Sequence, residues 1–187
     1  VAGASFTWTA EAASGVAGAN GGGGFLIDDA LVNSNATTEI AEYTVAIGSV
    51  ACPGEDVIVP VEVLPELELP GFVDLAGCPG SEFVVEPVES VEGASWSWEN
   101  DETGIGLGLS GAGNVPNFLG GANDSEGPIV GTVTVTGGVA NCPEEEASFD
   151  VTIYDLPGAA FEVSPNGGLH CLTGEATITG TSDPSGG

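Results

Sequence analysis

A repeat of about ninety residues constrains the fold of this chain more than any other feature of its sequence. The strand-like segment that ends at Trp8 returns in the segment that ends at Trp98, and Tyr43-Thr-Val45 returns as Val133-Thr-Val135. Both pairs have the same spacing, so two independent landmarks agree on one register. Self-similarity at a fixed period is the signature of a repeat architecture. We therefore interpret the chain as a piece of a tandem array, whose function belongs to the array and not to a single site.

Strands that end in Leu-Pro mark the limits of the repeating units. These dipeptides are Leu64-Pro65 and Leu156-Pro157. They divide the chain into the rear part of a first unit (residues 1–66), a complete unit (residues 67–157) and the front part of a third (residues 158–187).

The residue composition favours strands joined by turns. Gly accounts for 31 residues and Pro for 12, and the apolar residues occur in short runs rich in Val, Thr and Ile. Runs of this kind, broken by Gly, Asn, Asp and Pro, are typical of β-structure. A unit of about ninety residues matches a small β-sandwich, so the predicted fold is all-β. The expected strands cover residues 6–9, 40–47, 57–63, 83–88, 95–98, 129–136, 148–154 and 176–181.

The charge of the chain has one sign. There are 28 Asp and Glu residues and no Lys or Arg, which gives a net charge of −28. Long-range repulsion disfavours nucleic acid and anionic membrane surfaces, so we expect partners that are cations or neutral or cationic surfaces. The longest uncharged stretch, residues 103–123, contains seven Gly and Pro116. It lacks the continuous apolar face of a membrane-spanning helix, and we expect no membrane insertion.

The repeat register sorts the four cysteines into two types. Cys78 and Cys171 open a unit, whereas Cys52 and Cys142 precede its last strand. Because Cys78 and Cys142 share the complete unit, we expect a disulfide between them, with Cys52 and Cys171 paired to neighbouring repeats. Such bonds would indicate an oxidising compartment. The alternative is that all four are buried free thiols.

The sequence resembles the PKD-like repeats of large cell-surface adhesins from gliding Bacteroidota. In the complete unit the similarity lies in the segments 95–118, 131–136, 141–143 and 149–153, and in the first unit it lies in Trp8-Thr-Ala, residues 27–33 and Tyr43-Thr-Val45. The resemblance implies tandem immunoglobulin-like (PKD-like) β-sandwiches, export by a type 9 secretion route and an extracellular, cell-surface location. It implies a role in adhesion, gliding motility or a filament, and it implies no catalytic residues. The absence of Lys and Arg departs from the family pattern.

Clustered carboxylates are the best candidates for binding a metal ion. Loop carboxylates and carbonyls are the oxygen ligands that Ca²⁺ prefers, although none of these clusters has EF-hand spacing. The strongest candidate ligands are Glu99, Asp101 and Glu102, and the alternative is solvated loop charge. Calcium is the only cofactor that we consider. The other two clusters are Asp28-Asp29 and Glu144-Glu-Glu146.

Other motifs carry weaker chemical signals. The single histidine, His170, has no counterpart before Cys78, and a surface or turn role explains it better than a catalytic triad. Trp96 and Trp98 lie two apart and share one side of a strand, so we expect both in the core and not on a sugar-binding platform. Asn35-Ala-Thr and Asn123-Asp-Ser match the N-glycosylation sequon.

These patterns favour a non-enzymatic extracellular array that forms the stalk or fibre of a secreted bacterial surface adhesin or filament. The expected partners are neighbouring repeats or copies of the chain along a fibre, and surface glycans. The alternative function is a carbohydrate- or calcium-binding module of a secreted multidomain protein. A hydrolase is disfavoured, because units this small lack a cleft-forming insertion and any basic partner for paired acids.

Overall fold

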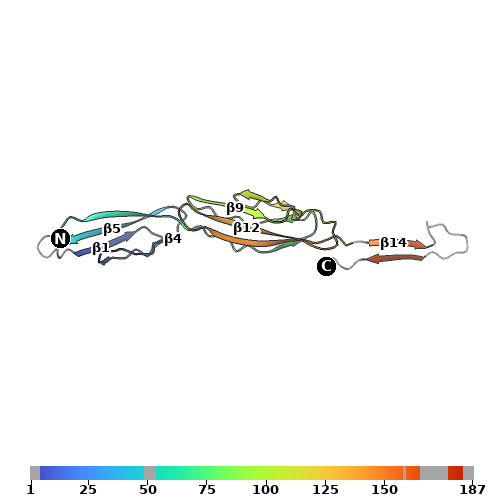
Figure 1. Ribbon diagram of the computed structural model, residues 1–187, viewed down its shortest axis with the longest axis horizontal. Coiled ribbons are helices and arrows are strands. Elements are labelled where there is room, and N and C mark those ends of the chain that lie inside the picture. Colours follow the sequence, from blue (N-terminus) through green and yellow to red (C-terminus); the bar gives the residue numbers. More distant parts are fainter. Residues whose placement is uncertain (1–4, 49–53, 158, 165–176, 183–187) are drawn as a thin grey trace. The chain divides into compact units, whose positions relative to one another are not determined.

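The computed structural model (Figure 1) describes residues 5–48, 54–157, 159–164 and 177–182, the last two ranges as backbone only. The chain divides into two compact units. The first contains residues 1–70, 88–96 and 136–146, and the second contains residues 71–87, 97–135 and 147–187. Strands dominate both units, and the one helical segment among the described residues is a 3-10 turn, η1 (Thr103–Ile105).

The N-terminal part of the chain forms a four-stranded antiparallel sheet in the order β3-β1-β5-β6. The register places Trp8 of β1 opposite Val45 of β5, and Tyr43 of β5 opposite Val59 of β6. Beside this sheet, β2 (Val16–Ala17) pairs with β4 (Val32–Asn33). The strands of the sheet are β1 (Ser5–Ala12), β3 (Gly22–Gly23), β5 (Glu39–Gly48) and β6 (Val57–Val63).

The core of this first part lies on one face of the four-stranded sheet. Ala41, Tyr43 and Val63 are buried there, and the partly buried Trp8 and Ala10 pack against them. Alternate residues of a strand point to opposite faces, so the spacing of Ala41 and Tyr43 places both on the same side. The sheet therefore has one apolar face, which is buried, and one face exposed to solvent, as a sheet of a β-sandwich does.

A five-stranded sheet in the order β10-β9-β12-β13-β7 forms the central part of the chain. A second layer consists of β8 and β11, whose Phe83 and Phe118 rings stack with their centroids 5.2 Å apart. The strands of the two layers are β7 (Leu75–Gly77), β8 (Glu82–Phe83), β9 (Ala94–Asn100), β10 (Ser110–Ala112), β11 (Phe118–Leu119), β12 (Ile129–Val139) and β13 (Glu145–Ile153). Figure 1 shows β9 and β12 side by side, and a separate pair, β14 (Ala159–Ser164) with β15 (Thr177–Ser182), follows in the chain.

The core between these layers follows the alternation seen in the sequence. Val133 of β12 and Val151 and Ile153 of β13 are fully buried, while the residues between them are more exposed. Burial of such a side chain contributes about 1.5–3 kcal/mol. The Phe83 ring of the second layer packs against Gly77 of β7. This contact joins the second layer to the sheet at the β7 edge.

A buried asparagine joins the last strand to the preceding loop in both parts of the chain. Asn33 Nδ2 donates to the carbonyl oxygens of Thr37 and Val63, both at 2.8 Å. Asn123 Nδ2 donates to Gly127 and Ile153, both at 2.9 Å. Each residue of the second set lies 90 positions after its counterpart in the first, so the contacts recur at the spacing of the sequence repeat. We call each set an asparagine clamp.

The observed strands agree with most of the expected ones, and β6 has the predicted bounds. The strand predicted over residues 83–88 is wrong beyond its first residue, because β8 ends at Phe83. Its partner β11 supplies only two residues, and Pro87 has no N–H for a longer ladder. The glycine-rich stretch from residue 103 to 123 contains η1, β10 and β11. No helix in the described part of the chain is long and apolar enough to cross a membrane.

Candidate functional site

The predicted calcium ligands are not brought together. Asp101 Oδ1 accepts a hydrogen bond from the Thr132 amide at 2.7 Å, and Glu102 Oε1 accepts one from the Gly104 amide at 2.7 Å, where it caps η1. Glu99 lies in β9 opposite Ser110. Over residues 5–48 and 54–157 no group of three or more His, Cys, Asp or Glu side chains is placed to hold a metal ion. The structure thus does not gather Glu99, Asp101 and Glu102 into one site, and two of these carboxylates accept hydrogen bonds from the backbone.

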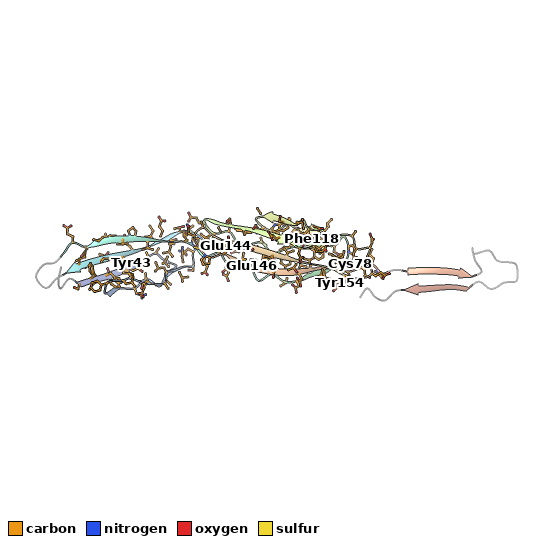
Figure 2. All side chains as sticks on the ribbon, viewed as in Figure 1. Tyr43, Cys78, Phe118, Glu144, Glu146 and Tyr154 are labelled. Atoms are coloured by element: carbon orange, nitrogen blue, oxygen red, sulfur yellow. The ribbon has the colours of Figure 1, made fainter. Side chains whose placement is uncertain are left out.

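In each of the other two acidic clusters, one carboxylate accepts hydrogen bonds from other residues of the chain. Asp29 Oδ2 accepts hydrogen bonds from the Tyr43 hydroxyl and the Asn20 amide, both at 2.7 Å. Glu145 Oε2 accepts one from the Leu69 amide at 3.3 Å. Its neighbours Glu144 and Glu146 are exposed, and Figure 2 shows them at the start of β13.

The Asp29–Tyr43 contact shifts the pKa of both groups. The hydrogen bond from Tyr43 is the main cause that lowers the pKa of Asp29 below 3.8, and the Asn20 amide adds to it. Burial is the main cause that raises the pKa of Tyr43 to about 12, and the hydrogen bond to Asp29 adds to it. The folded sheet therefore favours a charged Asp29 and a neutral Tyr43.

We expect Tyr43→Phe to lower the stability of the N-terminal sheet at pH 7 by about 1 kcal/mol, since it removes one hydrogen bond to a carboxylate. Because the pKa of Asp29 is depressed in the fold, the contribution of the contact is present above pH 4 and lost as the pH falls further. The neutral form of Tyr43 is favoured in the fold, so the wild-type chain should also lose stability between about pH 10 and pH 12. Urea unfolding of both proteins at pH 3, 7 and 11 measures this, and a difference that is the same at pH 3 and pH 7 would contradict the assignment.

The structure does not show the expected disulfide between Cys78 and Cys142. Both thiols are free and exposed. Gly77 pairs with Ile153 at the end of β13, whereas Cys142 precedes Glu145 at its start. Figure 2 shows Cys78 beside Tyr154 at the end of this strand. Cys52, Cys171 and His170 lie outside the described residues.

Of the two tryptophans of β9 that we expected in the core, Trp98 lies there and Trp96 is only partly buried. Trp98 is 5% exposed and Trp96 is partly buried. The Trp98 ring lies against Gly111 of β10, and a Cβ atom at that position would come within 2.6 Å of the ring. Trp8 lies against Gly22 of β3 in the same way. Trp8 and Trp98 therefore each pack against a glycine of the neighbouring short strand.

The outer edge of β13 holds the most distinctive feature of the central sheet. Leu75–Gly77 pairs in parallel with Val151–Ile153, the Asp74 carboxylate accepts from the Asp150 amide at 2.9 Å, and Leu69 contacts Glu145 as described above. Every contact joins residues 76 apart in the sequence. We call residues 69–77 the covering segment: residues 75–77 pair in parallel with the end of β13, and Asp74 and Leu69 each make one hydrogen bond nearer to its start.

Two comparisons with known proteins found similarities to this chain. A family model for the PKD-like domain matches residues 1–67. Among solved structures, the chicken CNTN1 FN1–FN3 domains are similar, with 5% sequence identity, coverage of 95% of this chain and 77% of that chain, and a TM-score of 0.36. A search of curated proteins gives no match. The described part of the chain is nearly all β-structure, and the first 67 residues are similar to PKD-like domains.

Proposed function

We propose that this chain is a non-enzymatic structural and adhesive repeat module in the stalk or fibre of a secreted bacterial surface adhesin or filament. The observation that carries the proposal is the parallel pairing of the first and last strands of the central sheet, β7 and β13. The similarity of residues 1–67 to PKD-like domains adds support, because these domains are common extracellular modules. The recurrence of the asparagine clamp at the repeat spacing fits a chain built from units in series.

The parallel pairing makes the sheet suited to bearing load. Tension along the chain enters the sheet at β7 and leaves it at the end of β13. Because the two strands are parallel neighbours, the tension pulls them in opposite directions along their common axis. The hydrogen bonds between them lie across that axis, so they must break together and not one after another. The hydrogen bonds from the Asp150 amide to Asp74 and from the Leu69 amide to Glu145 add to the contact of β7 with β13.

The charge of the chain suits an extracellular stalk. With 28 acidic residues and no Lys or Arg, copies of the chain repel one another and any anionic surface at low salt. The sequence offers no Lys or Arg site to a trypsin-like protease. An extracellular, cell-surface location, a type 9 export route and a part in gliding motility complete the proposal.

The rival function is a carbohydrate- or calcium-binding module, and one observation favours it. The Phe25 ring is 89% exposed and lies edge-on to Phe6, with a centroid distance of 5.8 Å. Exposed aromatic rings of this kind can stack on sugars. If the module were a lectin, Phe25 would be its most accessible contact.

A glycan array and a calcium titration of the full chain separate the two functions. For a stalk module we expect no saturable binding of glycans, and calcium binding that weakens with added salt as diffuse counter-ion binding does. The matched variant is Phe25→Ala, which removes the exposed ring and leaves the buried core unchanged. Saturable glycan binding by the wild-type chain that Phe25→Ala abolishes would replace the stalk with the lectin. One calcium ion bound with salt-independent affinity would likewise favour the rival.

A further inference from the structure

One residue that precedes β9 is hydrogen-bonded to the loop that precedes β5. The Glu92 amide donates to the Ala36 carbonyl at 2.8 Å, and Glu92 Oε2 accepts from the Thr38 amide at 2.7 Å. Glu92 belongs to the sequence repeat that covers residues 67–157, whereas Ala36 and Thr38 belong to the repeat before it. All three residues nevertheless lie in the first compact unit. We call these two hydrogen bonds the Glu92 latch.

Apolar side chains are buried in the same compact unit, where the two repeats follow one another. Val63 at the end of β6 and Leu67 after it are both buried. A Cβ atom at Gly137 of β12 would come within 3.0 Å of Leu67 Cδ2, and one at Gly93 would lie 3.6 Å from Val139 Cγ1. The second repeat therefore contributes apolar contacts as well as the latch. We define the joint as residues 36–38, 63–67, 88–93 and 137–139, all of which lie in the first compact unit.

The N-terminal sheet has only a small core of its own. Among its described residues, three apolar side chains are buried, those of Ala41, Tyr43 and Val63. Val57 and Val59 lie on the same face of β6 as Val63, but 49% and 42% of their surface is exposed. A sheet with so little buried apolar surface is marginally stable by itself. Its stability should therefore depend on the joint.

We propose that the joint couples the folding of the two repeats, and that Glu92 is the residue that holds the N-terminal sheet to the repeat that follows it. When repeats contact only their neighbours, the stability of each is its own stability plus that of its interfaces. The covering segment follows the joint in the chain, and its Leu69 amide donates to Glu145 in β13. The inference concerns stability alone, so it holds for a stalk and for a binding module.

The equivalent loop of the central sheet cannot form the same latch. The asparagine clamps place Thr37 and Gly127 at equivalent positions, so Thr38 corresponds to Pro128. Proline has no N–H, and Pro128 therefore cannot donate the hydrogen bond that Thr38 donates to Glu92. Thr38→Pro consequently gives the first loop the residue that the second loop already has at this position.

Amide hydrogen exchange of β5 and β6 in the full chain tests the proposal. Glu92→Ala should lower the protection of these amides about fivefold, because it removes one hydrogen bond of the latch. Glu92→Gln should keep most of the protection, since its side-chain oxygen still accepts from the Thr38 amide. Glu89→Ala is the matched control, because it removes the same charge at an exposed position of the same segment, and it should leave the protection unchanged.

Two further variants separate the latch from the apolar part of the joint. Thr38→Pro should lower the protection of β5 and β6 as Glu92→Ala does, and the double variant should lose no more than either single one, because both remove the same hydrogen bond. Leu67→Ala should lower the protection about thirtyfold, since Leu67 is 3% exposed and its loss leaves a cavity.

Three results would overturn the inference. They are equal protection of β5 and β6 in Glu92→Ala and Glu89→Ala, a loss in Glu92→Gln as large as in Glu92→Ala, and a loss confined to residues 88–93. Circular dichroism shows whether each variant remains folded. If Thr38→Pro or Leu67→Ala unfolds, the comparison of the two exposed positions, Glu92→Ala with Glu89→Ala, decides the outcome.

Discussion

Asn123→Ala should lower the stability of the central sheet by about 3 kcal/mol. Asn123 is 3% exposed, and its side chain makes four hydrogen bonds. The substitution leaves the Ile153 carbonyl buried without its donor, and a buried unpaired polar group costs more than the lost bond itself. Amide hydrogen exchange of Val151 and Ile153 in β13 measures the loss, because it reports the stability of this sheet separately from the rest of the chain.

Two matched variants test the cause of this effect. Asn123→Asp keeps the oxygen that accepts from Ser125 but replaces the donor with a second oxygen, so it should destabilise the sheet at least as much as Asn123→Ala at pH 7. Asn33→Ala removes the corresponding clamp, and its effect should appear in the exchange of β5 and β6. If Asn123→Ala costs less than about 0.5 kcal/mol, the clamp does not hold the last strand.

Gly106→Ala should destabilise the central sheet by about 3 kcal/mol or more. Gly106 ends η1 with a φ of 98°, a conformation that an L side chain rarely adopts. A Cβ atom there would collide with the Leu119 carbonyl oxygen and come within 2.7 Å of the Gly121 amide nitrogen. Because both obstacles are backbone atoms, the loop must move as a whole to relieve the clash.

Gly113→Ala is the matched control for this clash. Gly113 also has a positive φ, 75°, but a Cβ atom there would meet nothing within 4 Å. We expect it to cost about 1 kcal/mol, the strain of the backbone conformation alone. Thermal unfolding of both variants measures the difference. Equal shifts of the unfolding midpoint would show that packing against Leu119 and Gly121 does not contribute.

The strand pattern and the repeat are accessible from the sequence because they depend on local alternation and on self-similarity. Val57–Val63 and Ile129–Val139 have the clear β-branched runs of strands, and the Trp8 and Trp98 strands align at the spacing that also relates the two asparagine clamps. The short strands β3 and β10 are absent from the sequence-based prediction. They consist mainly of Gly and other small residues, so they lack the β-branched runs that mark a strand in the sequence. Each packs a glycine against a tryptophan ring, Gly22 against Trp8 and Gly111 against Trp98.

The candidate sites are harder to predict because they depend on contacts between distant residues. Cys78 and Cys142 share a unit of the sequence repeat, but both thiols are free and exposed in the structure. Asn123 matches a glycosylation sequon, whereas its side chain is buried and bonded to Ile153, 30 residues away. The clamp could be predicted from the repeat, because Asn33 and Asn123 occupy equivalent positions in the two units.

Single-molecule stretching of the full chain by its two termini tests the central claim most directly, namely that parallel terminal strands make the central sheet a load-bearing unit. We expect one abrupt unfolding step that releases residues 75–153, with a gain in length of about 260 Å. Asn123→Ala should lower the force of this step without changing its length. A gradual extension without a step, or a series of short steps as strands peel away one at a time, would contradict the load-bearing role of β7 and β13.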